Sequence, residues 1–293
     1  MKVDSYEIEL SNRDKVFFPA QNITKGDLVD YYKRIGDIMI PLISARPLTM
    51  HRFPDGIAKS GFYQQEMPGY FPDWFDRVEI EKKEGGSVTR PVCTRTADLV
   101  YLANQGCITP HIWLSRKDNL NNPDRMIFDL DPGAEDFKLV CRGALALREA
   151  LQTFDLVPFV MTTGSRGLHI VVPLKRGPDF DAVRKFARQK ADQVAGDNPG
   201  EFTTEQRKEK REERLYIDTS RNAYGQTAVA PYAVRALEGA PAATPLEWEE
   251  IEQGKIDSAQ KYSLNNIFRR LARKKDPWKD MDSKAVMIRE EWI

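Results

Sequence analysis

The sequence contains little cysteine and little histidine, three residues of each among 293. Cys93, Cys107 and Cys141 are widely spaced and form no CxxC pair. This spacing argues against a disulfide framework and against a cysteine zinc site, and it favours a reducing compartment.

Long apolar runs and net charge are absent as well. The longest apolar stretches, such as LHIVVPL, are far shorter than the roughly 20 residues that span a bilayer, and MKVDSYEIEL lacks the apolar core of a secretory signal. We therefore expect a cytoplasmic protein without a membrane partner.

Lys+Arg and Asp+Glu both total 44, so a nucleic-acid partner would need a local basic surface.

Helix and strand patterns alternate along the chain and predict an α/β protein, of the α+β kind with a mixed sheet. Residues 157–163 and 168–174 resemble two strands of a hairpin, which favours antiparallel pairing. We expect one domain over residues 1–293, with an N-terminal lobe at 1–120 and a catalytic lobe at 121–293. Hydrophobic residues, at 41%, are frequent enough for such a core.

Individual elements follow from periodicity and turn chemistry. Thr24 is a suitable N-cap for an amphipathic helix, and Gly85-Gly86 marks a hairpin within residues 77–94. We expect an aromatic-rich loop over 61–71. The expected helices cover 28–43, 96–106, 137–154, 181–195, 203–213 and the tail 258–293, and the expected strands cover 6–10, 47–53, 125–131, 157–163, 168–174 and 214–218.

Two carboxylates, Asp129 and Asp131, close the apolar strand RMIFDLD before a Pro-Gly turn. Because strand side chains alternate, both acids share one face. Their repulsion costs about 1 kcal/mol or more if they are partly buried, and Mg²⁺ or Mn²⁺ would remove it. The alternative is a plain turn that begins at Asp131.

A tight turn follows, in which Gly164 and Gly167 bracket Ser165 and Arg166. Its backbone N–H groups and Arg166 suit a phosphate, although the P-loop spacing is absent. His169 comes next, on the face of its strand opposite the apolar residues. A hairpin with one hydrogen-bonded histidine is the simpler alternative.

Asp218 ends the strand RLYID, where an aspartate commonly starts a turn or caps a helix. As a third carboxylate it would instead complete a two-metal site with Asp129 and Asp131. Such a site activates an attacking hydroxyl and stabilises a leaving group in both polymerases and nucleases. The acids alone therefore leave both classes open.

Taken together, the motifs resemble the polymerase domain of the bacterial end-joining ligase D, within the archaeo-eukaryotic primase superfamily. The resemblance rests on DLDPG, TTGSRGLH, YIDTSRNAYGQTAVAPYAVR and GAPAATPLEWEE, and on DKVFFP, TKGDLVDYY, RPLTMHRFPDG and TADLVYLANQG nearer the N-terminus. It implies a two-lobed primase-like fold. The chain corresponds either to one domain of such a protein or to a stand-alone polymerase.

The resemblance also implies roles for individual residues. Asp129, Asp131 and Asp218 would hold two Mn²⁺ or Mg²⁺ ions and activate the primer 3′-hydroxyl. The family usually has Lys where Arg166 stands, which keeps the charge but changes the geometry. The residues expected at the incoming NTP are Ser165, Arg166, His169, Arg211 (with Arg214 as its competitor), Arg235, Gln226 and His111.

Further residues match the DNA-binding elements of that family. Asn12, Lys15 and Lys25 would grip a 5′-phosphate across a gap, because an amide and two ammonium groups suit a dianion. Phe62 and Tyr63 would stack on the template base, which stabilises binding by roughly 1–3 kcal/mol per base. Arg52 would contact the DNA backbone.

The implied function is template-directed nucleotide addition that fills gaps and extends ends during non-homologous end joining, with a preference for ribonucleotides. The implied partners are broken or gapped double-stranded DNA carrying a 5′-phosphate, a separate ligase and Ku, at a prokaryotic nucleoid. A de novo primase, a two-metal nuclease and a non-catalytic DNA-end-binding module are the alternatives.

Overall fold

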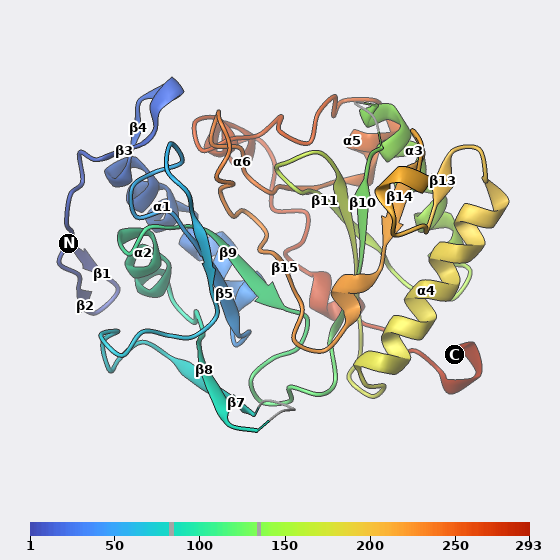
Figure 1. The fold of residues 1–293 in the computed structure, drawn as a ribbon, viewed down its shortest axis with the longest axis horizontal. Coiled ribbons are helices and arrows are strands. Elements are labelled where there is room, and N and C mark those ends of the chain that lie inside the picture. Colours follow the sequence, from blue (N-terminus) through green and yellow to red (C-terminus); the bar gives the residue numbers. More distant parts are fainter. Residues whose placement is uncertain (82–84, 134–135) are drawn as a thin grey trace. The chain divides into compact units, whose positions relative to one another are not determined.

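The structure is a computed structural model that describes residues 1–81, 85–133 and 136–293. The chain forms two compact units (Figure 1). Unit 1 comprises Met1–Asp118, Thr227–Ala242 and Ser263–Arg273; unit 2 comprises Asn119–Gln226, Ala243–Tyr262 and Lys274–Ile293. The expected lobes divided the chain once, near residue 120, whereas in the structure two later segments return to unit 1.

Unit 1 is built around a four-stranded antiparallel sheet. Its strands, in spatial order, are β15 (Thr227–Val229), β9 (Cys107–Trp113), β5 (Leu48–Arg52) and β6 (Phe62–Gln64). The pairing of β15 with β9 is the physical reason that a late segment belongs to unit 1, because its backbone groups complete that edge of the sheet.

Helices α1 (Lys25–Ile43) and α2 (Thr96–Asn104) pack against each other in unit 1 (Figure 1). Thr24 caps α1 in a reciprocal capping box with Asp27, as its position predicted. The remaining elements of unit 1 are β1 (Lys2–Val3), β2 (Tyr6–Glu7), β3 (Val16–Phe18), η1 (Pro19–Gln21), β4 (Ile23–Thr24), β7 (Arg77–Glu81), β8 (Ser87–Pro91) and α6 (Ile267–Leu271).

Unit 2 contains a six-stranded mixed sheet in which only the β13–β14 pair is parallel. The spatial order is β13 (Phe202–Thr203), β14 (Leu215–Asp218), β10 (Arg125–Asp131), β12 (Leu168–Pro173), β11 (Phe159–Thr162) and β16 (Pro245–Leu246). The expected mixed sheet is therefore confirmed.

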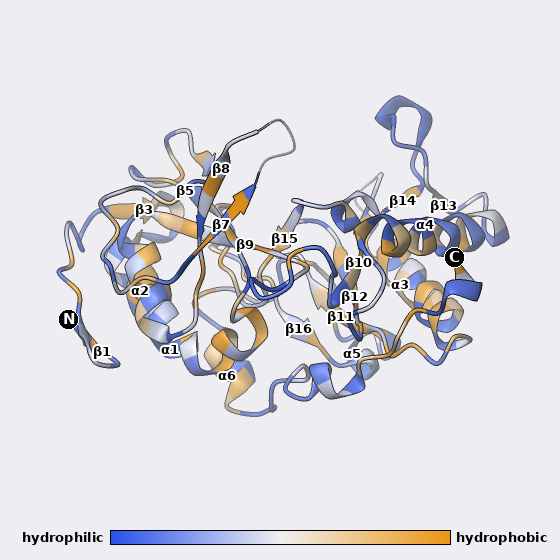
Figure 2. Cartoon of the chain, turned by 90° about the horizontal axis from the view of Figure 1, so that it is seen from below, coloured by the Kyte–Doolittle hydropathy of each residue, from blue (hydrophilic) through white to orange (hydrophobic). Residues whose placement is uncertain are grey.

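The hydrophobic core of unit 2 lies between one face of this sheet and two helices, α3 (Phe137–Gln152) and α4 (Phe180–Asp197). Leu130, Leu168 and Ile217 point into that core. Because side chains alternate along strands, their neighbours Asp129, His169 and Asp218 occupy the opposite face. Hydrophobic residues lie along one side of α4 and hydrophilic residues along the other (Figure 2). Unit 2 also contains α5 (Trp248–Glu252), η2 (Lys208–Lys210), η3 (Ser220–Asn222), η4 (Met281–Lys284) and η5 (Glu290–Trp292).

One predicted helix is wrong, and another is confirmed only in part. Thr203 ends β13, and residues 204–213 contain only the short 3-10 helix η2, since this charged run offers no apolar stripe to bury. Within 258–293 the helical parts are α6, η4 and η5. Several short strands went unpredicted; among them, β6 lies inside the expected aromatic loop, and β9 follows α2. No helix in the described part of the chain is long and apolar enough to cross a membrane.

Candidate active site

The pairing of three strands brings the three predicted acids onto one face of the unit 2 sheet. Asp129 on β10 lies opposite Asp218 on β14 and, on its other side, opposite His169 on β12. Asp131 lies two residues further along β10, opposite Tyr216. Side chains opposite each other on antiparallel strands have Cβ atoms about 4.5–5.5 Å apart. The strand register therefore brings together Asp129 and Asp131, which are close in the sequence, and Asp218, which is far from them in the sequence.

Each carboxylate has its own set of partners. Asp131 accepts a 2.8 Å hydrogen bond from Arg166 Nη2 and lies 3.8 Å from Arg211 Nη1. Asp129 lies 3.3 Å from His169 Nε2 and 3.8 Å from Arg221 Nε. The three arginines offset the repulsion between the acids.

Asp218 is held by its own strand end instead. It accepts hydrogen bonds from the Ser220 backbone N–H at 2.7 Å and from Ser220 Oγ at 2.9 Å. Tyr216 Oη lies 3.3 Å from the same carboxylate. Burial, together with the Asp218 charge, raises the pKa of Tyr216 to about 12, so its hydroxyl stays protonated. Asp218 is thus oriented before any substrate arrives.

The glycine turn between β11 and β12 lies directly against β10. Thr163 N–H donates to Gly167 O at 3.0 Å, and Gly164 adopts a φ of +65°. A Cβ at Gly167 would come within 1.8 Å of Leu130 O, so only glycine allows this approach. The turn presents Ser165 and Arg166 beside the acids of β10.

The structure distinguishes Arg211 from its competitor Arg214. The Arg211 guanidinium lies 3.6 Å from the Tyr216 ring centre and donates to the carbonyls of Glu205 and Gln206. Arg214 instead donates to the carbonyls of Arg211 and Lys210. Among these two, only Arg211 forms a described ion pair with Asp131.

In unit 1, the predicted phosphate residues meet at the beginning of α1. Lys25 N–H donates to Lys15 O at 2.8 Å, and Lys15 N–H donates to Asn12 O at 3.1 Å. Lys25 is only 6% exposed, and its Nζ donates to Ser11 O and Oγ. Burial and the nearby Lys15 charge lower the pKa of Lys25. Two ammonium groups beside a helix N-terminus favour an anion.

Phe62 and Tyr63 are both exposed but lie on opposite sides of β6. Phe62 pairs with Arg52, whose guanidinium is 5.7 Å from the phenyl ring centre, whereas Tyr63 pairs with His51. Arg52 also donates to Gln64 Oε1 and to Gln105 O. One template base would therefore stack on one of these rings and not on both.

The other predicted nucleotide contacts fall into both units. His111 on β9 belongs to unit 1 and contacts the Tyr63 ring edge-on at 5.6 Å between ring centres. Arg235 also belongs to unit 1, and its charge acts on His51. Gln226 is exposed and is the residue of unit 2 that precedes β15.

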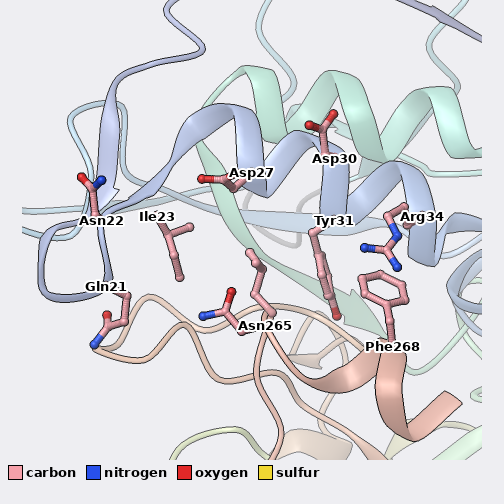
Figure 3. Close-up of a pocket in the computed structure, with 10 residues that line it drawn as sticks. Gln21, Asn22, Ile23, Asp27, Asp30, Tyr31, Arg34, Asn265 and Phe268 are labelled. Atoms are coloured by element: carbon pink, nitrogen blue, oxygen red, sulfur yellow. The ribbon is translucent and has the colours of Figure 1, made fainter. Parts of the chain in front are cut away.

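A separate cavity of about 430 Å³ lies in unit 1 beside α1 (Figure 3). Its charged side chains already have partners: Asp27 belongs to the capping box, Asp30 pairs with Arg13, and Arg34 covers the Phe268 ring at 3.8 Å. This cavity contains none of the predicted phosphate residues.

Comparison with known protein families identifies the family of this chain. Residues 24–278 match the model of the LigD primase-polymerase domain. The chain belongs to this family. It is accordingly a DNA-directed nucleotidyltransferase of the primase-polymerase type, and the resemblance inferred from the motifs is confirmed.

Individual relatives agree with this assignment. The LigD primase-polymerase chain described here is 32% identical over 253 residues to the multifunctional non-homologous end joining protein LigD of Mycolicibacterium smegmatis, covering 85% of this chain and 33% of that protein. It is 26% identical to the bifunctional LigD of Bacillus subtilis, covering 94% of this chain and 44% of that protein. The chain thus spans about a third to under a half of these relatives.

A solved structure is similar over nearly the whole fold. The polymerase domain of Mycobacterium tuberculosis ligase D, in complex with DNA, superposes with a TM-score of 0.89 at 28% identity, covering 95% of this chain and 99% of that one. The chain thus has the fold of a LigD polymerase domain.

Members of this family are nucleotidyltransferases that generally use divalent metals, and the donor set fits such ions. Carboxylate oxygens are the ligands that Mg²⁺ and Mn²⁺ prefer, and Asp129, Asp131 and Asp218 share one sheet face. No three His, Cys, Asp or Glu side chains within the described ranges form a ready metal cluster. Arg166, Arg211 and Arg221 lie within 4 Å of carboxylate oxygens of Asp129 or Asp131, so a cation bound to these two acids would compete with them.

Two residues at this site were missed by the sequence interpretation. Arg221 follows Asp218 by three residues and contacts Asp129. The buried Asn222 amide accepts from Ile127 N–H at 2.9 Å and donates to Ile127 O at 2.7 Å, replacing a strand beside β10. In the sequence, the feature that could have indicated these two residues is the polar pair Arg221-Asn222, which follows the strand-ending Asp218 by three residues.

Proposed function

We propose that this chain fills short gaps and extends broken DNA ends during non-homologous end joining, adds ribonucleotides in preference to deoxyribonucleotides, and recognises a downstream 5′-phosphate. The observation that carries the proposal is the shared face of Asp129, Asp131 and Asp218, bordered by a turn that presents Arg166. The basic loop at the beginning of α1 supports the 5′-phosphate role. The sugar preference rests on the family alone.

In the proposed reaction the primer 3′-hydroxyl attacks the α-phosphate of an NTP and pyrophosphate leaves. Asp129, Asp131 and Asp218 would hold two Mn²⁺ or Mg²⁺ ions, whose chemistry is to lower the hydroxyl pKa and neutralise phosphate charge. Arg166 and Arg211 would leave Asp131 and bind the triphosphate. There they would stabilise the negative charge that develops on the leaving pyrophosphate. Ser165 and His169 would orient the same phosphates.

Residues of unit 1 would bind the DNA. Lys15, Lys25 and Asn12 would hold the 5′-phosphate, while Tyr63 or Phe62 would stack on a template base and Arg52 would contact the backbone. From the family resemblance we also propose that His111, Arg235 and Gln226 each contact the nucleotide. We further propose that the protein acts in a prokaryotic cytoplasm at the nucleoid, together with a separate ligase and Ku.

The decisive experiment uses a primer–template with a short gap, with or without a downstream 5′-phosphate, supplied with Mn²⁺ or Mg²⁺ and either NTPs or dNTPs. Extension by the wild-type chain should need the metal, increase with the 5′-phosphate and favour NTPs. Asp129→Asn and Asp218→Asn should each reduce kcat/KM by about 10²–10³-fold, because a charge-stabilising group is lost. The exposed Asp181→Asn serves as the matched control and should extend normally.

Each other outcome identifies a different function. Degradation of the strands would indicate the two-metal nuclease, and synthesis without a primer would indicate a de novo primase. Extension by the Asp129→Asn variant at the wild-type rate would contradict the assignment of the acids.

A further inference from the structure

Tyr63 is stacked on a histidine of its own sheet. His51 on β5 lies directly opposite Tyr63 on β6, with ring centres 4.0 Å apart and ring planes inclined by 7°. Tyr63 nevertheless remains 60% exposed. One face of the phenol ring is therefore covered by the imidazole, while more than half of the Tyr63 surface remains exposed.

The imidazole ring of His51 also contacts two further rings, those of Phe53 and His111. Phe53, which is 9% exposed, contacts His51 edge-on at 4.6 Å between ring centres, and the two residues are two positions apart on one side of the chain. His111 contacts His51 and Tyr63 edge-on at 6.3 Å and 5.6 Å. The stack thus runs from a buried phenyl ring through His51 to an exposed tyrosine.

The charge state of His51 suits this arrangement. Partial burial, and secondly the charge of Arg235, lower its pKa to about 4, so the imidazole is uncharged at neutral pH. An uncharged flat ring stacks on a phenol in parallel without adding a charge beside it. The neighbouring Phe62 has a different partner, the Arg52 guanidinium, on the other side of the strand.

We propose that His51 is a positioning residue that holds the exposed Tyr63 ring in one orientation, so that the ring forms a rigid stacking platform for an unpaired template base. The inference rests on the proposed function, since it assigns the base to Tyr63. A side chain that is already ordered loses less conformational entropy on binding, which corresponds to roughly a two- to tenfold gain in affinity.

The test measures binding and extension of a gapped primer–template in which the unpaired template base is 2-aminopurine, whose fluorescence is quenched by stacking. His51→Ala removes the support, and His51→Leu restores bulk without a flat ring. His51→Phe restores a flat uncharged ring. Tyr63→Ala and the double variant H51A/Y63A complete the cycle, and thermal unfolding of every variant identifies any folding defect.

We expect His51→Ala and His51→Leu to weaken quenching and to raise the KM for gapped DNA roughly two- to tenfold with little change in kcat. His51→Phe should restore both values. The His51→Ala change should have no further effect in the Tyr63→Ala background, since the platform is already gone.

Three outcomes would overturn the inference: His51→Phe as impaired as His51→Ala, His51→Leu equal to wild type, or additive losses in the double variant. Failure of the proposed function looks different, because the wild-type chain would then not extend the primer at all. The quenching data would still decide whether His51 orders Tyr63.

Discussion

At the scale of single residues, Asp129, Asp131 and Asp218 share a sheet face but differ in how their charge is compensated. Arginines contact Asp129 and Asp131, whereas Asp218 receives hydrogen bonds from Ser220. An arginine can swing away when a phosphate or a cation arrives, but a backbone N–H cannot. The Asp218 carboxylate is consequently held in place, whereas the partners of Asp129 and Asp131 are exchangeable.

His51 makes stability depend on pH. Its pKa falls from an ordinary 6.5 to about 4 on folding, so between these values the unfolded chain binds a proton that the folded chain excludes. The free energy of unfolding should therefore decrease as the pH falls from 6.5 towards 4, and this contribution should be constant above 6.5. With allowance for its partial exposure the loss is about 1–2 kcal/mol.

Urea unfolding at pH 7 and at pH 4.5 tests this expectation in the wild-type chain and in His51→Phe. The variant should lose less stability on acidification, because the ionisable neighbours of this site, Arg235, His111 and Tyr63, are common to both chains. Equal losses in the two proteins would show that His51 does not titrate in this way.

At the scale of elements, the turn between β11 and β12 determines where the phosphate-facing residues lie. It closes through Thr163 and Gly167 and lies against the carbonyl of Leu130, on the strand that carries two of the acids. If the hairpin of β11 and β12 did not contact β10, the sheet would not determine the position of this turn. Its contact with β10 makes the position of Arg166 depend on the sheet.

Gly167→Ala should therefore damage both stability and activity. The added methyl group would overlap Leu130 O, and overpacking of this kind costs about 1–3 kcal/mol. Gly200→Ala is the matched control, because a Cβ there meets nothing within 4 Å and the change should stay within about 0.5 kcal/mol. Chemical denaturation and the gap-filling assay measure the two effects, and an unchanged Gly167→Ala would rule out the close approach.

At the scale of the whole molecule, the chain has no net charge, since 44 basic residues balance 44 acidic ones. Binding to DNA must then come from local basic groups and not from a general attraction. Within unit 1, the junction of Lys15 and Lys25 at the beginning of α1 is such a group.

Salt dependence isolates the contribution of that junction. Replacing a lysine that contacts a phosphate should reduce the slope of log Kd against log salt by about 1. We expect Lys15→Ala and Lys25→Ala to do so for gaps with a 5′-phosphate and to leave unphosphorylated gaps nearly unchanged. Lys33→Ala, an exposed lysine of the same helix, is the control.

Fluorescence anisotropy over a salt series measures these slopes, and thermal unfolding checks Lys25→Ala, since that lysine is largely buried. Equal reductions for phosphorylated and unphosphorylated gaps would exclude a specific 5′-phosphate role.

The sequence by itself determined the features that depend on near neighbours. Strand alternation put Asp129 and Asp131 on one face, Thr24 capped α1, the glycine turn stood before His169, and the ordered motifs indicated the family. Such rules act over a few residues, so they hold whatever the distant chain does.

Only the tertiary structure decided which distant residues meet. The register of β14 placed Asp218 opposite Asp129, Arg211 and not Arg214 reached Asp131, and Thr227–Val229 joined the sheet of unit 1. Tyr63 met His51 because β6, expected to be a loop, pairs with β5. These outcomes depend on pairing between segments far apart in the chain, which is set by how the whole molecule buries its apolar residues and satisfies its backbone hydrogen bonds.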